Sequence, residues 1–213
     1  MASNPVTLFR LLGCAAASWI LVSCAGQRRF DPLQVAGRIV PVAAWGGTAL
    51  PEAARPRSHS IRHLTLHHGG EDFPASRDVG QYLRNLQDWS RREKRWVDIP
   101  YHFIIDLQGR TYAGRPLEYA GDTNTEYDPT GHALVCVLGN YETAVPSPAQ
   151  LAAVEDVFAW LCQRFGLGPE TIAGHKDHSA QTVCPGTNLH AQLANGRIRA
   201  GVERRLQSAR IPR

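Results

Sequence analysis

Two long stretches of the chain carry helix signals, and the first has apolar residues at the three-to-four-residue spacing of an amphipathic helix. The first spans residues 76–95, where Ser76 is placed to cap the helix. One apolar face of this helix is formed by Val79, Leu83, Leu86 and Trp89. The second spans residues 147–165, with Ser147 as the N-cap and Pro148 as the first helical residue. The pattern therefore predicts two strong helices, one in each half of the folded region.

A third helix is expected over residues 189–208, where the turn-favouring pair at residues 195–196 could interrupt it. Between the helices lie short apolar runs that are typical of buried strands. They cover residues 63–67, 100–106, 110–113, 133–138 and 171–174. The second and third of these runs flank a Gln108-Gly109 turn and predict a hairpin. Because strands alternate with helices, we expect an α/β fold: a single domain with a central mixed β-sheet flanked by helices.

The N-terminus departs from this pattern and resembles an export signal. Residues 11–26 form an apolar run that is too short and too rich in small residues for a membrane span. Its end, Leu21-Val22-Ser23-Cys24, resembles a bacterial lipobox, in which cleavage leaves the cysteine as a lipid-bearing N-terminus. The alternatives are ordinary cleavage and a retained anchor.

We therefore expect a lipoprotein-type signal peptide over residues 1–23, a tether over 24–38 and one folded domain over 39–208. The expected location is the cell envelope, with the protein held at a membrane through a lipid on Cys24 and facing the periplasm.

Composition and charge narrow the function. The 213-residue chain has 43% hydrophobic and 20% charged residues, as a globular domain does. Its net charge of +4 suits an anionic partner such as a cell-wall polymer, but it is too small to indicate nucleic acid. Apart from Cys14 and Cys24 in the N-terminal apolar run, the cysteines are Cys136, Cys162 and Cys184. In an oxidising compartment this odd number leaves at least one cysteine to stay free, bind a ligand or pair between chains.

Unusual polar residues gather where predicted strands end. These positions are His67-His68, Tyr101-His102, and the stretch Gly174–Gly186 with His175, His178 and Cys184. Zinc prefers nitrogen and sulfur ligands, and a catalytic zinc needs only three of them. The alternatives are ordinary buried or surface histidines and a disulfide from Cys184 to Cys136 or Cys162. Taken together, the histidine pair before glycines and the Gly-His and Cys-Pro-Gly segments favour a metal site.

In this order, five segments resemble the zinc-dependent N-acetylmuramoyl-L-alanine amidases, the family that includes the peptidoglycan recognition proteins. The segments are Trp45-Gly46, Leu64–His68, Asp98–Arg115, Val135–Tyr141 and Gly174–Gly186. The resemblance covers residues 39–189, with its core motifs within 61–189. It departs from the family at Gly69, which replaces a serine or threonine, and in one extra residue between His175 and Cys184.

The resemblance implies a role for each matching residue. The zinc ligands would be His67, His175 and Cys184. Tyr101 falls at the position of a catalytic tyrosine, and Thr182 at that of a residue that polarises the scissile carbonyl. His68 would support the site or face the substrate, while His102, His132 and His178 would not bind the metal.

The implied reaction is hydrolysis of the amide between N-acetylmuramic acid and L-alanine in peptidoglycan, with Zn²⁺ as cofactor. Two alternatives come from other classes. A non-catalytic peptidoglycan-binding module would lack a metal ligand, whereas this chain keeps all three. A redox protein built on Cys136, Cys162 and Cys184 is less favoured, because there is no Cys-x-x-Cys pair.

Overall fold

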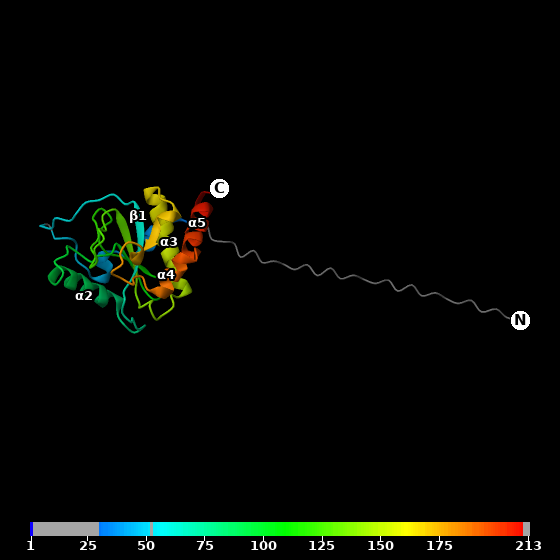
Figure 1. The fold of residues 1–213 in the computed structure, drawn as a ribbon, viewed down its shortest axis with the longest axis horizontal. Helices are drawn as coiled ribbons and strands as arrows, with labels where there is room; N and C mark the ends of the chain where they lie inside the picture. The colour runs from blue at the N-terminus through cyan, green and yellow to red at the C-terminus, as the bar shows by residue number, and fades with distance from the viewer. Residues whose placement is uncertain (2–29, 52, 211–213) are drawn as a thin grey trace.

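A computed structural model describes residue 1 and residues 30–51 and 53–210. In this part of the chain five strands form one sheet in the order β3-β2-β4-β1-β5 (Figure 1). The strands are β1 (His63–His68), β2 (Phe103–Ile105), β3 (Thr111–Ala113), β4 (His132–Val137) and β5 (Ile172–Gly174). Only the β2–β3 pair is antiparallel, so the sheet is mixed. The predicted α/β class, the mixed sheet and the hairpin are confirmed.

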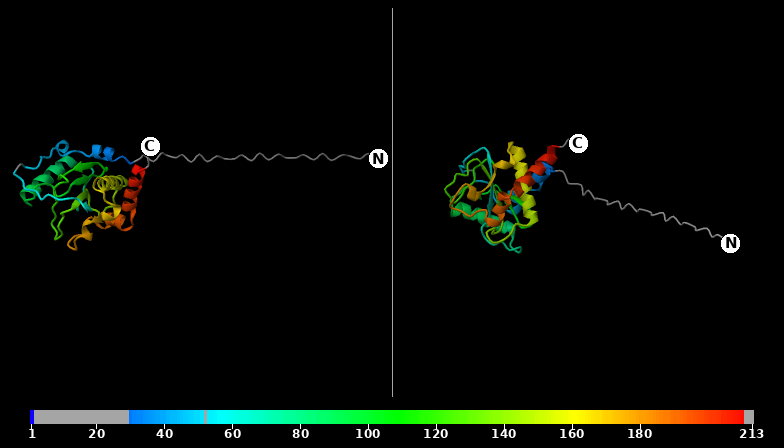
Figure 2. Two further views of the ribbon diagram at one scale, coloured as in Figure 1. Left: turned by 90° about the horizontal axis from the view of Figure 1, so that it is seen from above. Right: turned by 45° about the vertical axis from the view of Figure 1, so that its right-hand side comes forward.

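Helices cover both faces of this sheet, and its central strands β1 and β4 are accordingly buried at all but one position. On one face lie α3 (Pro148–Phe165), α4 (Thr187–Ala194) and α5 (Arg197–Arg210). On the other face lies α2 (Val79–Arg92), together with the short 3-10 turn η1 (Val42–Trp45). Figures 1 and 2 show this three-layer arrangement, with α2 on the opposite side of the sheet from α3 and α5. No helix among the described residues has the length and apolar character needed to cross a membrane.

The α2 helix begins later than predicted. Asp78, rather than Ser76, is the N-cap, and its carboxylate accepts a hydrogen bond from the Gln81 N–H at 2.5 Å. Residues 74–77 form a turn in which the Arg77 N–H donates to the Pro74 carbonyl. Asp and Ser are comparable caps, so the position of the turn before the helix decided which one is used.

The helices nearer the C-terminus match their sequence signals closely. At the start of α3, Ser147 and Gln150 form a reciprocal capping box, and Gly166 ends the helix with a left-handed φ of 66°. The predicted interruption of the third helix is present: α4 ends before Asn195, and Gly196 has a φ of 79°. The chain therefore forms two helices where one interrupted helix was expected.

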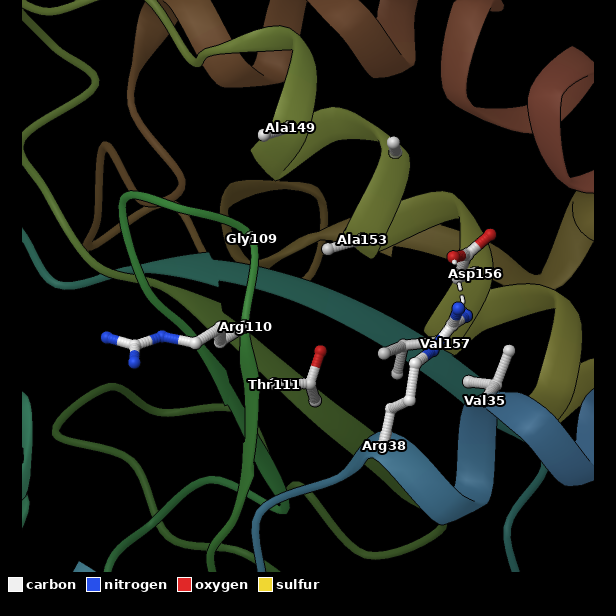
Figure 3. A pocket seen from close by; sticks show the side chains of 10 residues that line it. Val35, Arg38, Gly109, Arg110, Thr111, Ala149, Ala153, Asp156 and Val157 are labelled. Atoms are coloured by element: carbon white, nitrogen blue, oxygen red, sulfur yellow. Dashed lines mark ion pairs between the residues drawn. The ribbon is translucent and has the colours of Figure 1, made fainter.

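Residues 32–38 differ from the expected tether, because they form the helix α1 (Pro32–Arg38). Asp31 caps it by accepting hydrogen bonds from two N–H groups, and Val35 is buried in the core shared with α3. A shallow cavity of about 310 Å³ lies between α1, α3 and the turn before β3 (Figure 3). At the edge of this cavity Arg38 and Asp156 of α3 form an ion pair, with 3.6 Å between the Arg38 Nη2 and the Asp156 Oδ2. The signal segment, most of the tether and Cys24 lie outside the described residues.

Trp45 packs onto the domain as predicted. Its side chain is only 4% exposed, and its Nε1–H donates to the Ala113 carbonyl at 2.8 Å. It lies in the apolar cluster between α2 and the sheet.

Candidate functional site

Three separate segments bring the predicted metal ligands to one edge of the sheet. His67 lies near the carboxyl end of β1, and His175 directly follows β5 at the start of the 3-10 turn η3 (His175–Asp177). Cys184 lies in the loop that leads to α4. Because β1 and β5 are parallel neighbours, their carboxyl ends meet at the same edge. One ligand atom from each of the three residues lies within 4.8 Å of the others, and all three side chains are buried.

The spacing of these atoms fits a zinc ion. The His67 Nδ1 and the Cys184 Sγ are 3.6 Å apart, and the rings of His67 and His175 have centroids 4.6 Å apart. One nitrogen and one sulfur bound to a tetrahedral zinc would be separated by about 3.5 Å. The other nitrogen of His67, Nε2, is buried without a hydrogen-bond partner. The backbone of His67 is fixed by the sheet, so only the ring nitrogen Nε2 is left without a partner.

Burial tunes the protonation of the cluster. It lowers the pKa of His67 well below its usual value and lowers that of His175 to about 4, so both imidazoles are neutral at pH 7. Burial also raises the pKa of the Cys184 thiol to about 12. Neutral imidazoles offer the lone pairs that a metal needs, whereas the thiol must release its proton when a metal binds. Metal binding is therefore coupled to the loss of a proton.

No disulfide competes for the thiol. Cys136, Cys162 and Cys184 are all free and buried, so neither of the disulfides considered for Cys184 is formed in the described structure. Cys136 is paired in register with His67 on the neighbouring strand β4, and burial raises the pKa of its thiol well above the usual value. It is an apolar neighbour of the site rather than a fourth member of the cluster.

A cleft with a volume of about 500 Å³ opens onto the cluster. One wall is largely aromatic and comes from α2 and the segment after it, with Tyr82, Leu86, Trp89 and Trp96. The lining also includes hydroxyl and amide groups from Thr123, Asn124, Thr125, Gln181 and Thr182. Such a volume and a mixture of apolar and polar walls are typical of small-molecule sites.

The remaining predicted site residues also line this cleft. The ring of Tyr101 has its centroid 5.3 Å from that of His67, and burial raises the pKa of its phenol well above the usual value. The Thr182 Oγ1 accepts a hydrogen bond from the Cys184 N–H at 3.0 Å. His68 is turned away from the cluster, since its Nδ1 accepts from the Tyr141 N–H at 3.2 Å. The backbone N–H of His68 donates to the Cys184 Sγ at 3.4 Å.

Sequence reasoning missed two hydroxyl groups beside His175. The His175 Nε2 lies 2.8 Å from the Thr125 Oγ1 and 3.3 Å from the Thr123 Oγ1. Both threonines are in an irregular loop with no periodic pattern, so no local signal could have identified them. His102, His132 and His178 are outside the three-residue cluster.

Comparisons with known proteins point to one family. The sequence model of N-acetylmuramoyl-L-alanine amidases matches residues 57–187. Peptidoglycan recognition protein 1 of Mus musculus is 30% identical, over 71% of this chain and 84% of that protein. An N-acetylmuramoyl-L-alanine amidase of Homo sapiens is also 30% identical, over 71% of this chain but only 27% of that protein.

A solved structure shows the same fold. The ectodomain complex of peptidoglycan recognition proteins LCa and LCx with tracheal cytotoxin matches with a TM-score of 0.63 at 25% identity. The match covers 73% of this chain and 93% of that one. The relatives thus include proteins named for an amidase activity and proteins named for recognition.

Proposed function

Because the chain belongs to the N-acetylmuramoyl-L-alanine amidase family, we propose that it is a zinc-dependent enzyme of peptidoglycan hydrolysis. The bond cleaved is the amide that joins N-acetylmuramic acid to the L-alanine of the stem peptide. The observation that carries this proposal is the convergence of His67, His175 and Cys184 at the base of the cleft. Relatives that are named only for recognition make binding without cleavage the competing function.

The three ligands supply what the ion requires. His67 and His175 present neutral nitrogens, and Cys184 presents a sulfur that becomes anionic when it binds. A bound zinc supplies a Lewis acid that polarises the scissile carbonyl and lowers the pKa of water to about 7. The His68 N–H that donates to the Cys184 sulfur stabilises the negative charge on that ligand.

Two further residues contact the reacting amide in this proposal. The Tyr101 phenol keeps its proton at neutral pH, so it can donate a hydrogen bond to the oxygen that gains negative charge. The Thr182 hydroxyl already accepts from the Cys184 N–H, which orients its own proton away from the backbone. Both side chains line the cleft, and both act as donors to the oxyanion.

We expect the purified chain to contain about one zinc ion per molecule and to release stem peptides with a free N-terminal L-alanine from peptidoglycan. His67→Ala and Cys184→Ala should lose both zinc and activity, because each removes a ligand of the cluster. Metal analysis and mass spectrometry of the products measure the two outcomes. Cys162→Ala is the matched control, because this buried thiol lies on α3 outside the cluster, and it should keep both.

The same experiment separates the two functions. Zinc-loaded protein that binds peptidoglycan but yields no cleaved product would show a recognition module. Full hydrolysis by the Cys184→Ala variant would show that this metal site is not the catalytic centre.

We also propose that the chain is exported and anchored to a membrane by a lipid on Cys24, as the sequence before it resembles a lipobox. In a bacterial host, the full chain should incorporate labelled fatty acid and sediment with membranes. Cys24→Ala should abolish both. Equal labelling of the two proteins would contradict the anchor.

A further inference from the structure

We propose that Thr125 is a positioning residue for the metal site: its hydroxyl fixes the ring of His175 so that one nitrogen faces the cluster. This inference rests on the proposed zinc site. It assigns a role to a loop that the family resemblance did not single out.

The contacts around His175 carry the argument. Its Nε2 is 2.8 Å from the Thr125 Oγ1 and 3.3 Å from the Thr123 Oγ1. The two hydroxyl oxygens are themselves 2.9 Å apart, and the Thr125 N–H donates to the Thr123 Oγ1 at 3.2 Å. With Nε2 held by hydroxyls, Nδ1 is the nitrogen of His175 left to bind an ion. A hydrogen bond at one ring nitrogen selects the tautomer that bares the other.

The two histidines differ in how firmly their backbone segments are held, and this difference explains why His175 needs the support of Thr125. His67 lies within β1, which is paired on both sides by β4 and β5, so the sheet fixes its position. His175 follows the short edge strand β5 and begins a single 3-10 turn. Fewer backbone hydrogen bonds hold that segment, and the orientation of the ring therefore depends more on side-chain contacts.

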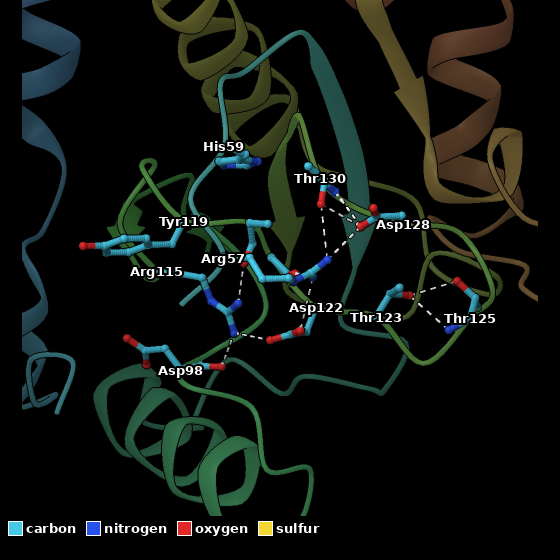
Figure 4. A network of polar contacts seen from close by, with 12 residues as sticks. Arg57, His59, Asp98, Arg115, Tyr119, Asp122, Thr123, Thr125, Asp128 and Thr130 are labelled. Carbon is cyan, nitrogen blue, oxygen red and sulfur yellow. Dashed lines mark hydrogen bonds and ion pairs between the residues drawn. The ribbon is translucent and has the colours of Figure 1, made fainter. Parts of the chain in front are cut away.

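The start of the loop that carries Thr125 is held by a network of polar contacts, as Figure 4 shows. The buried guanidinium of Arg115 donates to the Ala120 carbonyl and to the Asp122 carboxylate, both at 2.5 Å. It also donates to the carbonyls of Asp98 and Ile99, at 2.8 and 3.0 Å. A charge that is fully paired and hydrogen-bonded in this way is expensive to displace. Arg115 thus ties the start of the threonine loop to the segment that leads into Tyr101.

A second contact holds the far side of the loop. Glu126 follows Thr125 in the sequence, and its carboxylate accepts a hydrogen bond from the Ser179 Oγ at 2.6 Å. Ser179 belongs to the segment between His175 and Cys184, so the loop is attached to the ligand-bearing segment itself. Thr125 is therefore held between two fixed points, and its hydroxyl can impose an orientation on the ring.

The test compares zinc affinity between variants of the full chain, by competition with a chromophoric chelator. Thr125→Val keeps the shape of the side chain but removes the hydroxyl, and we expect zinc to bind about 10-fold to 100-fold more weakly. Thr125→Ser restores the hydroxyl and should recover most of the affinity. Thr130→Val is the control, because the Thr130 hydroxyl lies in the same loop but bonds to Asp128 and Arg57.

A spectroscopic readout separates positioning from general damage to the fold. In the cobalt-substituted protein, Thr125→Val should shift the visible absorption bands, because the nitrogen ligand is no longer held in one orientation. The Thr130→Val control should show the spectrum of the unchanged protein. Equal zinc affinity and equal cobalt spectra for Thr125→Val and the unchanged protein would overturn the positioning role.

The outcomes distinguish this inference from the proposed function. If Thr125→Val weakens zinc binding but the unchanged protein cleaves no peptidoglycan, the positioning role stands and the amidase proposal fails. If the unchanged protein cleaves peptidoglycan and Thr125→Val holds zinc as tightly, only the positioning role fails. An unchanged protein that binds no zinc would overturn both.

Discussion

The residues of the candidate site owe their chemistry to burial more than to neighbouring charges. Removal from water is the largest cause that lowers the pKa of His67 and His175, and the largest that raises the pKa of Tyr101 and Cys184. The same environment therefore produces neutral nitrogen ligands, a phenol that keeps its proton and a thiol that stays protonated until a metal binds. Each of these states suits hydrolysis at a zinc site near neutral pH.

Tyr101 offers a test at this scale. Tyr101→Phe removes only the hydroxyl and leaves the cluster of His67, His175 and Cys184 in place, so zinc should be retained. If the phenol donates to the developing oxyanion, kcat for peptidoglycan cleavage should fall about 100-fold, the usual cost of one such donor. Steady-state kinetics with metal analysis of the same sample check both points. A variant with unchanged kcat would remove Tyr101 from the mechanism.

At the scale of elements, local signals explain most of the helices but not all of their ends. The capping box and the stop glycine of α3 each depend only on residues at that end of the helix. The helix therefore begins and ends where its sequence predicts. At α2 two acceptable caps stand two residues apart, and the preceding turn favours Asp78 over Ser76. A cap is thus predictable where one candidate stands alone.

The cap of α3 gives a prediction about stability. Ser147→Ala should lower the free energy of unfolding by about 1 kcal/mol, because the Gln150 N–H loses its acceptor. Ser147→Asn should retain most of the stability, since asparagine caps equally well. Chemical denaturation of the three proteins measures the difference. Equal stability of the alanine variant would show that water replaces the cap at no cost.

At the scale of the whole molecule, a buried histidine links fold stability to pH. His102 is fully buried between β4 and the segment before the threonine loop. Its Nδ1 accepts from the Leu134 N–H and its Nε2 donates to the Tyr119 carbonyl, both at 2.9 Å. Burial lowers its pKa from 6.5 to about 3. The folded protein therefore keeps this imidazole neutral across a range in which the unfolded chain would protonate it.

Protonation of His102 in the unfolded chain shifts the equilibrium toward unfolding. The contribution of His102 to the free energy of unfolding is therefore complete above pH 6.5 and is lost as the pH falls towards 3. The loss approaches about 1.4 kcal/mol per pH unit for one histidine. His102→Gln keeps a donor and an acceptor but cannot titrate, so its stability should fall less steeply between pH 6.5 and 4.5. Urea denaturation of metal-free protein at several pH values compares the slopes. Parallel slopes would contradict this role for His102.

The sequence by itself determined the elements whose patterns are local and repeated. The strands around His67 and Cys136, the hairpin after Tyr101 and the helix α3 all follow from runs of apolar residues, turn residues and caps. It also supplied the ligand types, because the order of five short segments resembles one family. Residues 32–38 carry a cap and a proline at the start of a helix but no repeated apolar pattern, and Val35 is the one residue of this short helix that is buried in the core.

Only the tertiary structure decided which polar groups meet. His67 and Cys184 are 117 positions apart in the sequence, yet the parallel order of β1 and β5 and the loop before α4 bring their atoms to 3.6 Å. The hydroxyl of Thr125 reaches His175 because Arg115 anchors an irregular loop, and no periodic signal marks that contact. Local patterns specify elements because each depends on its near neighbours. A site at the edge of a sheet depends on distant segments, whose meeting only packing can fix.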